Sequence, residues 1–117
     1  MRHLYIENPR EHALEQIDPY GRRMGFDAGV RSVLRDCIDE AWDDGHAHLT
    51  LATVAIKTGV SEQAAREALH ELTRRGVIEM QTSSAGRLVV RPLVLASGIG
   101  TQAGVGWWQR LELQDEL

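Results

Sequence analysis

The sequence is poor in cysteine and lacks long apolar runs, and each shortage excludes a class of protein. Cys37 is the only cysteine, so no disulfide can form within the chain. No segment approaches the ~20 consecutive apolar residues that a membrane-spanning helix needs. The first residues, Met1 to Tyr5, lack the apolar stretch of a secretory signal. We therefore expect a cytoplasmic protein whose 117 residues form one modest core.

The sequence also lacks an overall excess of positive charge. Its net charge of −4 argues against a general affinity for polyanions. The only positive segment is 46–92, which has six basic residues against four acidic ones. Segment 1–45 has six against ten, and segment 93–117 has one against three. Any binding of nucleic acid should therefore depend on segment 46–92 and should be weak when it is nonspecific.

Motifs that carry catalysis are missing as well. The chain has no glycine-rich phosphate loop, no nucleophile elbow, no cysteine pair and no zinc-protease motif, so we expect neither an enzyme nor a cofactor. His46 and His48 form an H-x-H pair, but a metal site needs three or four converging ligands, and none is predicted. The acidic residues of segment 39–44 are best explained as the solvated face and end of a helix.

The first 45 residues predict two helices. Asn8 followed by Pro9 is typical of a helix start, and a short helix over 9–17 would end in a turn over 18–21. Asp27 is a candidate N-cap for a longer helix that Gly45 would end. This second helix has apolar residues at steps of three and four, namely Val30, Val33, Leu34, Cys37, Ile38, Ala41 and Trp42.

Segment 46–92 has the order of elements found in a winged helix-turn-helix. A short edge strand over 46–49 precedes a helix over 51–58, which Thr50 caps and Gly59 ends. Ser61 caps a second helix that runs to Arg75, and two strands over 77–81 and 87–91 flank a polar loop. We predict a mainly α fold with a small β-hairpin wing (α+β). It divides into an N-terminal extension (1–26), a winged helix-turn-helix domain (27–96) and a glycine-rich linker with a tryptophan-containing tail (97–117).

Several residues meet the spacing rules of the helix-turn-helix together. Gly59 supplies the positive φ that the turn needs, Val60 fills the corner between the helices, and Ala55 leaves room where they cross. A buried stripe is expected on the second helix, with apolar contacts from the first. These residues are Ala65, Ala68, Leu69 and Leu72, with Val54 and Ile56 from the first helix.

The segment from Leu51 to Glu79 resembles the winged-helix DNA-binding domain of GntR-type bacterial repressors. The resemblance rests on Gly59-Val60-Ser61, Arg66-Glu67-Ala68-Leu69, Leu72 and Gly76-Val77-Ile78. It covers about 45 residues, and some phage and plasmid replication proteins share the pattern. The resemblance implies that Arg66 contacts DNA. Glu62 and Ala64 depart from the family, which usually has a basic residue and often a threonine there, and the effector-binding domain of these repressors has no counterpart in this chain.

The predicted interface with DNA has a base-facing part and a phosphate-facing part. Gln63, Arg66 and His70 share one helix face, with Glu62 in the first turn, and arginine and glutamine are suited to guanine and adenine edges. Glu62 either complements the helix dipole or accepts from a cytosine amino group. The same residues could also be only the solvated face of an amphipathic helix. Candidate phosphate contacts are Thr50, Lys57, Ser61, Thr73, Arg74, Arg75, Ser83, Ser84, Arg87 and Arg91.

The sequence thus predicts a small transcriptional repressor that binds duplex DNA as a homodimer and occludes its operator. Two alternatives remain: a plasmid or phage replication or partition factor that binds origin repeats, and a protein-interaction module that does not bind DNA. The dimer contact is expected from Trp107, Trp108 and Leu111 or from the N-terminal segment. The operator sequence and any controlling ligand are not encoded in a recognisable motif.

Overall fold

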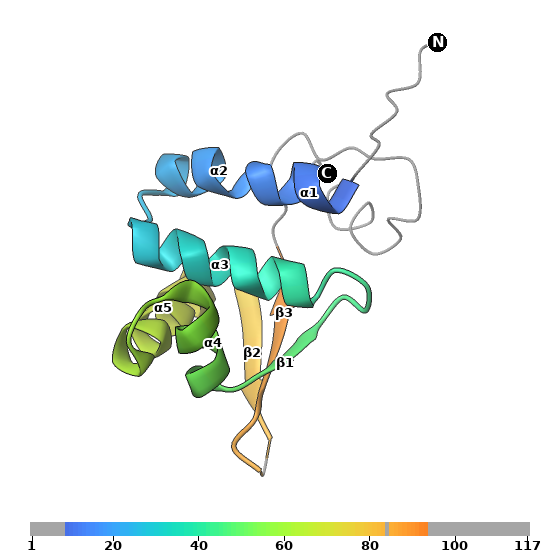
Figure 1. The fold of residues 1–117 in the computed structure, drawn as a ribbon, viewed down its shortest axis with the longest axis vertical. Coiled ribbons are helices and arrows are strands. Elements are labelled where there is room, and N and C mark those ends of the chain that lie inside the picture. The colour runs from blue at the N-terminus through green and yellow to red at the C-terminus, as the bar shows by residue number, and fades with distance from the viewer. Residues whose placement is uncertain (1–8, 84, 94–117) are drawn as a thin grey trace.

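The computed structural model describes residues 9–83 and 85–93 and has an α+β winged-helix-like fold, as the sequence predicts. Helix α3 crosses the middle of the molecule, with α1 and α2 on one side and α4, α5 and the sheet on the other (Figure 1). The three strands form an antiparallel sheet in the order β1-β3-β2. The elements are α1 (Pro9–Glu15), α2 (Ile17–Met24), α3 (Ala28–Glu40), β1 (Ala47–Leu49), α4 (Leu51–Thr58), α5 (Glu62–Arg74), β2 (Ile78–Thr82) and β3 (Leu88–Pro92).

Helix α4 begins and ends where the sequence predicts, and α5 begins after its predicted cap and ends at Arg74, one residue before the predicted end. The Thr50 side chain accepts from the Thr53 amide, and the Thr53 hydroxyl accepts from the Thr50 amide in return, which forms a capping box. Gly59 ends α4 with φ = 77°, a left-handed conformation that glycine adopts without a steric penalty. Ser61 then caps α5 by accepting from the Ala64 amide. These local signals fix the angle at which α5 leaves the turn.

The wing is a hairpin of β2 and β3, with β1 added on the far side of β3. Val90 of β3 lies opposite Met80 of β2 on one side and opposite Ala47 of β1 on the other, so these three residues form one row across the sheet. At the hairpin end, the Ser83 amide donates to the Arg87 carbonyl at 2.8 Å, and the Arg87 amide donates to the Ser83 hydroxyl at 3.1 Å. Both hydrogen bonds close the loop, which places Arg87 near the tip of the wing.

The predicted turn over 18–21 is wrong, because these residues lie inside α2. Pro19 occupies the first turn of this helix, where the backbone N–H that proline lacks has no partner within the helix. The Tyr20 amide donates to the Gln16 carbonyl at 3.1 Å, so the helical hydrogen bonds begin directly after the proline. The proline therefore starts a second helix, and α1 ends at Glu15, two residues earlier than predicted.

Gly21 serves close packing instead of a turn. A Cβ atom at this position would lie only 2.5 Å from Cγ of Arg31 on α3. The Arg31 guanidinium in turn donates to the Phe26 carbonyl at 2.7 Å and to the Asp18 carboxylate at 3.3 Å. The glycine thus lets α2 approach α3 closely enough for this arginine to tie the two helices together.

Helix α3 begins at its predicted cap but ends earlier than expected. The Asp27 carboxylate accepts from the Val30 amide at 2.9 Å. Regular helix stops at Glu40, four residues before the predicted end at 44, and a turn leads to Gly45 with φ = 84°. Segment 39–44 contains four carboxylates. A helix C-terminus carries a partial negative charge that repels carboxylates, so continuing the helix through this segment is unfavourable.

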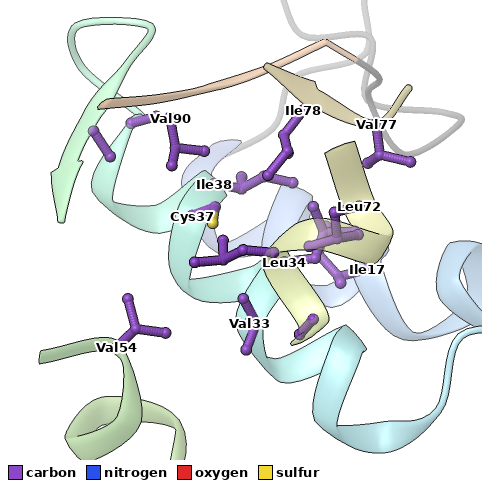
Figure 2. Packing of buried hydrophobic residues seen from close by; sticks show 14 of the residues in the cluster. Ile17, Val33, Leu34, Cys37, Ile38, Val54, Leu72, Val77, Ile78 and Val90 are labelled. Carbon is purple, nitrogen blue, oxygen red and sulfur yellow. The ribbon is translucent and has the colours of Figure 1, made fainter. Parts of the chain in front are cut away.

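The core surrounds α3, which packs against α5 and the inner face of the sheet on one side and against α1 and α2 on the other (Figure 2). The predicted stripe of α5 is buried, and so is the stripe of α3 from Val33 to Ala41. Ile56 of α4 is the exception to the predicted set: it is 81% exposed, whereas Val54 is fully buried. A short helix of period 3.6 cannot turn residues two positions apart toward the same side, so only Val54 faces α3.

Three predictions fall partly or wholly outside the described residues. These are the domain boundary at 97, the dimer contact through Trp107, Trp108 and Leu111, and the phosphate contact of Ser84. Among the residues that the structure does describe, no helix is long and apolar enough to cross a membrane.

Candidate nucleic-acid interface

The outward face of α5 carries the base-facing residues that the sequence predicts. Gln63, Arg66 and His70 are exposed, because the buried stripe of α5 occupies the opposite face. The three side chains border one shallow hollow, which Glu67, Glu71 and Arg74 complete. This face follows the helix from its N-terminal turn almost to its end. The side chains of this face are thus open to an external partner along most of the helix.

Arg66 differs from most cations of the protein in having no anionic partner. Within 9–83 and 85–93, only four arginines take part in no ion pair: Arg22, Arg23, Arg66 and Arg87. Arg66 lies in the middle of the exposed α5 face and Arg87 near the wing tip. A guanidinium without a partner keeps all of its donors available for an external acceptor such as a base edge or a phosphate.

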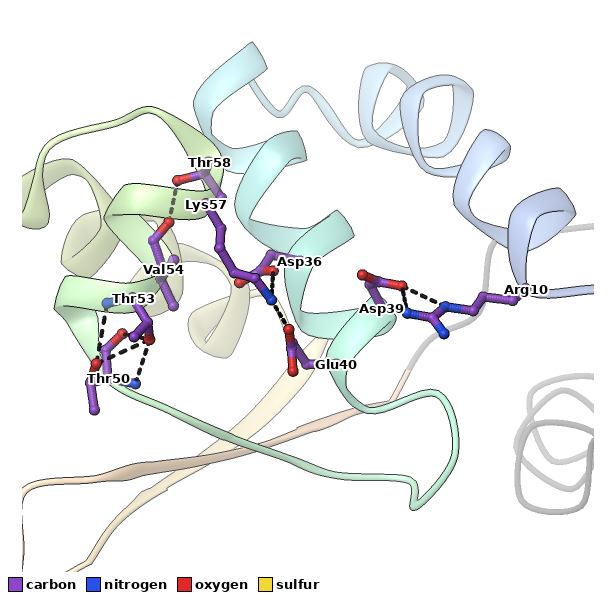
Figure 3. A network of polar contacts seen from close by, with 9 residues as sticks. All are labelled: Arg10, Asp36, Asp39, Glu40, Thr50, Thr53, Val54, Lys57 and Thr58. Carbon is purple, nitrogen blue, oxygen red and sulfur yellow. Dashed lines mark hydrogen bonds and ion pairs between the residues drawn. The ribbon is translucent and has the colours of Figure 1, made fainter.

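Three of the cations that are predicted to contact phosphate pair with carboxylates of the protein. Lys57 reaches across from α4 to Glu40 and Asp36 of α3, as Figure 3 shows. Arg74 donates to both carboxylate oxygens of Glu71 at 2.7 Å, and Arg91 donates to Glu79 on the neighbouring strand at 2.8 Å. Contact of these cations with phosphate would compete with the internal pairs, although exposed pairs of this kind contribute only ~0–1 kcal/mol each.

Arg75 is also engaged within the protein. Its guanidinium pairs with Glu71 at 3.4 Å, donates to the Met24 carbonyl at 3.1 Å and lies 5.1 Å from the Phe26 ring centroid. Two arginines thus share Glu71, and their hydrogen bonds lower the pKa of its carboxyl, with the bond from Arg74 contributing most. The end of α5 is fastened to the α2–α3 connection by this arginine.

The four predicted hydroxyl contacts that lie within the described residues have internal partners as well. Thr50 and Ser61 cap α4 and α5, and the Thr73 hydroxyl donates to the Leu69 carbonyl at 2.7 Å. The Ser83 hydroxyl accepts from the Arg87 amide. A capping hydroxyl still has its own proton to donate, so a role at phosphate is compatible with the cap.

Acidic residues shape the same face. Glu62 is exposed in the first turn of α5, where a carboxylate complements the helix dipole. Glu67 accepts from the side-chain amide of Gln63 at 3.0 Å, which engages one of the two protons of that amide and orients it toward Glu67. Arg66 is consequently the residue of this face that is best prepared to read a base.

Asp36 is a buried acid for which the sequence predicts no functional role. It is 8% exposed, and its Oδ2 accepts no hydrogen bond from the described residues. Lys57 Nζ lies 3.7 Å from Oδ1 and is the nearest opposing charge. Burial raises the pKa of this carboxyl above its ordinary value, and the charge of Asp39 acts in the same direction against the effect of Lys57. The local sequence carries no signal for this burial, because Asp36 lies outside the apolar stripe of its helix.

We expect this buried carboxyl to make stability depend on pH. Because its pKa is raised in the folded state, the folded protein binds the proton more tightly than the unfolded chain, and stability falls as the pH rises through that pKa. Asp36→Asn should remove this effect, so the wild type should gain stability relative to the variant as the pH falls from 7 toward ~4. Urea unfolding of both proteins across this range measures the difference.

A second variant separates the acid from its cation. Lys57→Met leaves the buried Asp36 carboxylate without its partner and should cost roughly 1–3 kcal/mol at pH 7. The double variant with Asp36→Asn should recover part of that loss. Parallel pH profiles for the wild type and Asp36→Asn would instead mean that water solvates the carboxyl in solution.

The remaining titratable groups of residues 9–83 and 85–93 include two neighbouring histidines and a buried cysteine. The His46 and His48 rings meet edge to face at 5.2 Å, on the face of the sheet that is exposed to solvent. No group of three or more His, Cys, Asp or Glu side chains in the described part of the chain could hold a metal ion. Cys37 is completely buried, and its burial raises the pKa of the thiol, so it is not a reactive nucleophile.

Comparison with known proteins adds no assignment. No protein-family model matches the sequence, and no curated protein matches it either. The likeness to GntR-type repressors thus stays a prediction from the residues of segment 51–79. Function has to be inferred from the exposed face of α5, the wing and the charges that they carry.

Proposed function

We propose that this protein binds duplex DNA in a sequence-specific manner, with α5 in the major groove and the wing along the backbone. The observation that carries the proposal is Arg66, an exposed and unpaired guanidinium at the centre of the outward face of α5. Arg87, near the wing tip, is likewise exposed and takes part in no ion pair within the described residues. Most other described cations are neutralised within the protein, so an external anion gains more at these two positions than at the paired cations.

The proposed role is that of a small cytoplasmic repressor which occludes its operator as a homodimer. A single winged helix reads only a short half-site, and two copies double both the base contacts and the phosphate contacts. Dimerisation matters more for this protein because three carboxylates on or beside the reading face repel the DNA phosphates. They belong to Glu62, Glu67 and Glu71. A homodimer would select a palindrome, since the symmetry of the site mirrors that of the protein.

Selection of bound duplexes from a random pool tests this proposal, followed by titration of the selected duplex at several salt concentrations. We expect one enriched palindrome and an affinity that falls linearly with salt on logarithmic axes. Direct repeats in place of a palindrome would contradict the repressor role and favour an origin-binding factor. No enrichment together with no salt dependence would overturn DNA binding and favour a protein-interaction module.

A further inference from the structure

We infer that Arg22 and Arg23 form a second phosphate-binding surface, which contacts the duplex backbone beyond the segment that α5 reads. This inference rests on the proposed function and extends it to the N-terminal helices. The two side chains are adjacent and exposed in the last turn of α2. We call Arg22 and Arg23 the arginine pair. Together with Arg66 and Arg87, they are the cations of the described chain that take part in no ion pair.

The nearby carboxylates are already committed to other partners. Asp18 lies four residues before Arg22 on the same helix, where an ion pair would be expected. Its two oxygens instead pair at 3.3 Å with Arg31 and Arg35 of α3. On the other side of the arginine pair, the Asp27 carboxylate caps α3 by accepting from the Val30 amide. The positive charge of the arginine pair is therefore not compensated locally.

The arginine pair is held in a fixed position relative to the reading helix. Arg75, directly after α5, donates to the carbonyl of Met24 and packs over the ring of Phe26. Residues 25–30 then line a groove along the flank of α5 with Ala64, Glu67, Ala68 and Glu71. The last turn of α2 thus lies beside the C-terminal end of α5, and any surface that it presents is oriented with α5 as one body.

The arrangement places positive charge on both sides of α5. In Figure 1, α2 lies above α3 and the tip of the β2–β3 hairpin lies at the bottom of the view, with α5 at a level between them. A duplex that receives α5 in its major groove presents phosphates on both edges of that groove. The wing with Arg87 meets one edge, and the arginine pair meets the other. Guanidinium groups suit this role because they bind phosphate oxygens bidentately.

A purely structural role for the arginine pair makes a different prediction. Cations in the last turn of a helix interact favourably with its dipole, which accounts for a positive charge there without any ligand. Such a role affects the stability of α2 and leaves DNA binding unchanged. Phosphate binding instead changes the number of counterions released, which the dependence of affinity on salt measures directly.

The test compares Arg22→Ala/Arg23→Ala with the matched variant Arg22→Lys/Arg23→Lys on a selected duplex that extends several base pairs beyond each half-site. The alanine variant should reduce the slope of log affinity against log salt by about 1.8 per bound protomer, since each lost phosphate contact removes about 0.9. The lysine variant should keep most of the slope. Base preference in the random pool should stay the same in both variants.

Trimming the duplex to the selected site provides the control on the DNA side. Wild type and alanine variant should then bind alike, because the flanking phosphates are gone. An unchanged slope on the extended duplex, with wild-type binding intact, would overturn the inference and leave the proposed function standing. A wild-type protein that shows no salt-dependent binding at all would overturn both.

Discussion

Arg66→Ala is expected to weaken binding to the selected duplex by roughly 1–3 kcal/mol, a factor of about 5 to 150, and to relax base preference near one position of each half-site. The guanidinium is exposed, has no ion pair within the described residues and lies centrally on the outward face of α5. A bidentate contact with guanine uses two of its donors at once, so truncation removes both hydrogen bonds. A competition titration against duplexes substituted at each position measures both effects.

Two variants show whether this loss is due to base reading. Arg66→Lys keeps the charge but loses the planar fork, so it should keep the salt dependence and still lose base preference. Arg91→Ala removes another exposed arginine, which already pairs with Glu79, and it should change affinity far less. If Arg66→Ala bound the selected duplex as tightly as the wild type, α5 would not be the reading helix.

The helix-turn-helix could be predicted because its signals are local. Thr50 and Ser61 accept hydrogen bonds from amides three residues ahead, and Gly59 takes a positive φ at the end of α4. Each of these features depends on a few consecutive residues and not on the rest of the chain. The exposed face of α5 follows from the same local pattern, because burying Ala65, Leu69 and their neighbours forces Arg66 outward.

Features that depend on distant residues could not be predicted in this way. The positive charge of Lys57 predicts a contact with phosphate. Its ion-pair partners Asp36 and Glu40 lie on another helix, so the local sequence does not predict them. Pro19 resembles a turn residue, and its position in the first turn of α2 becomes apparent only once α2 packs on α3. The free arginine pair has the same origin, since Asp18 is occupied by arginines of α3.

Ile56 shows that the burial of an apolar residue also depends on distant parts of the chain. An isoleucine in a short helix, two residues after a buried valine, predicts an apolar contact from composition, but the direction of α4 leaves it in solvent. The chain therefore offers two isoleucines of identical chemistry in opposite surroundings, because Ile38 of α3 is only 1% exposed. The pair tests how much of the stability resides in the core between α3, α5 and the sheet.

Ile38→Ala is expected to lower the free energy of unfolding by ~2–5 kcal/mol, a large share of the ~5–15 kcal/mol typical of a folded domain. The substitution removes apolar contacts and leaves a cavity where α3 packs against the sheet, as Figure 2 shows for the side chains around Ile38. Chemical denaturation followed by circular dichroism measures the loss.

Ile56→Ala removes the same atoms from a side chain that is 81% exposed, and it should change the free energy of unfolding by no more than ~0.5 kcal/mol. A large loss from Ile56→Ala would mean that this side chain is buried in the protein as it exists in solution. If that loss also grew with protein concentration, Ile56 would lie in a contact between two copies, because stability that comes from association depends on protomer concentration.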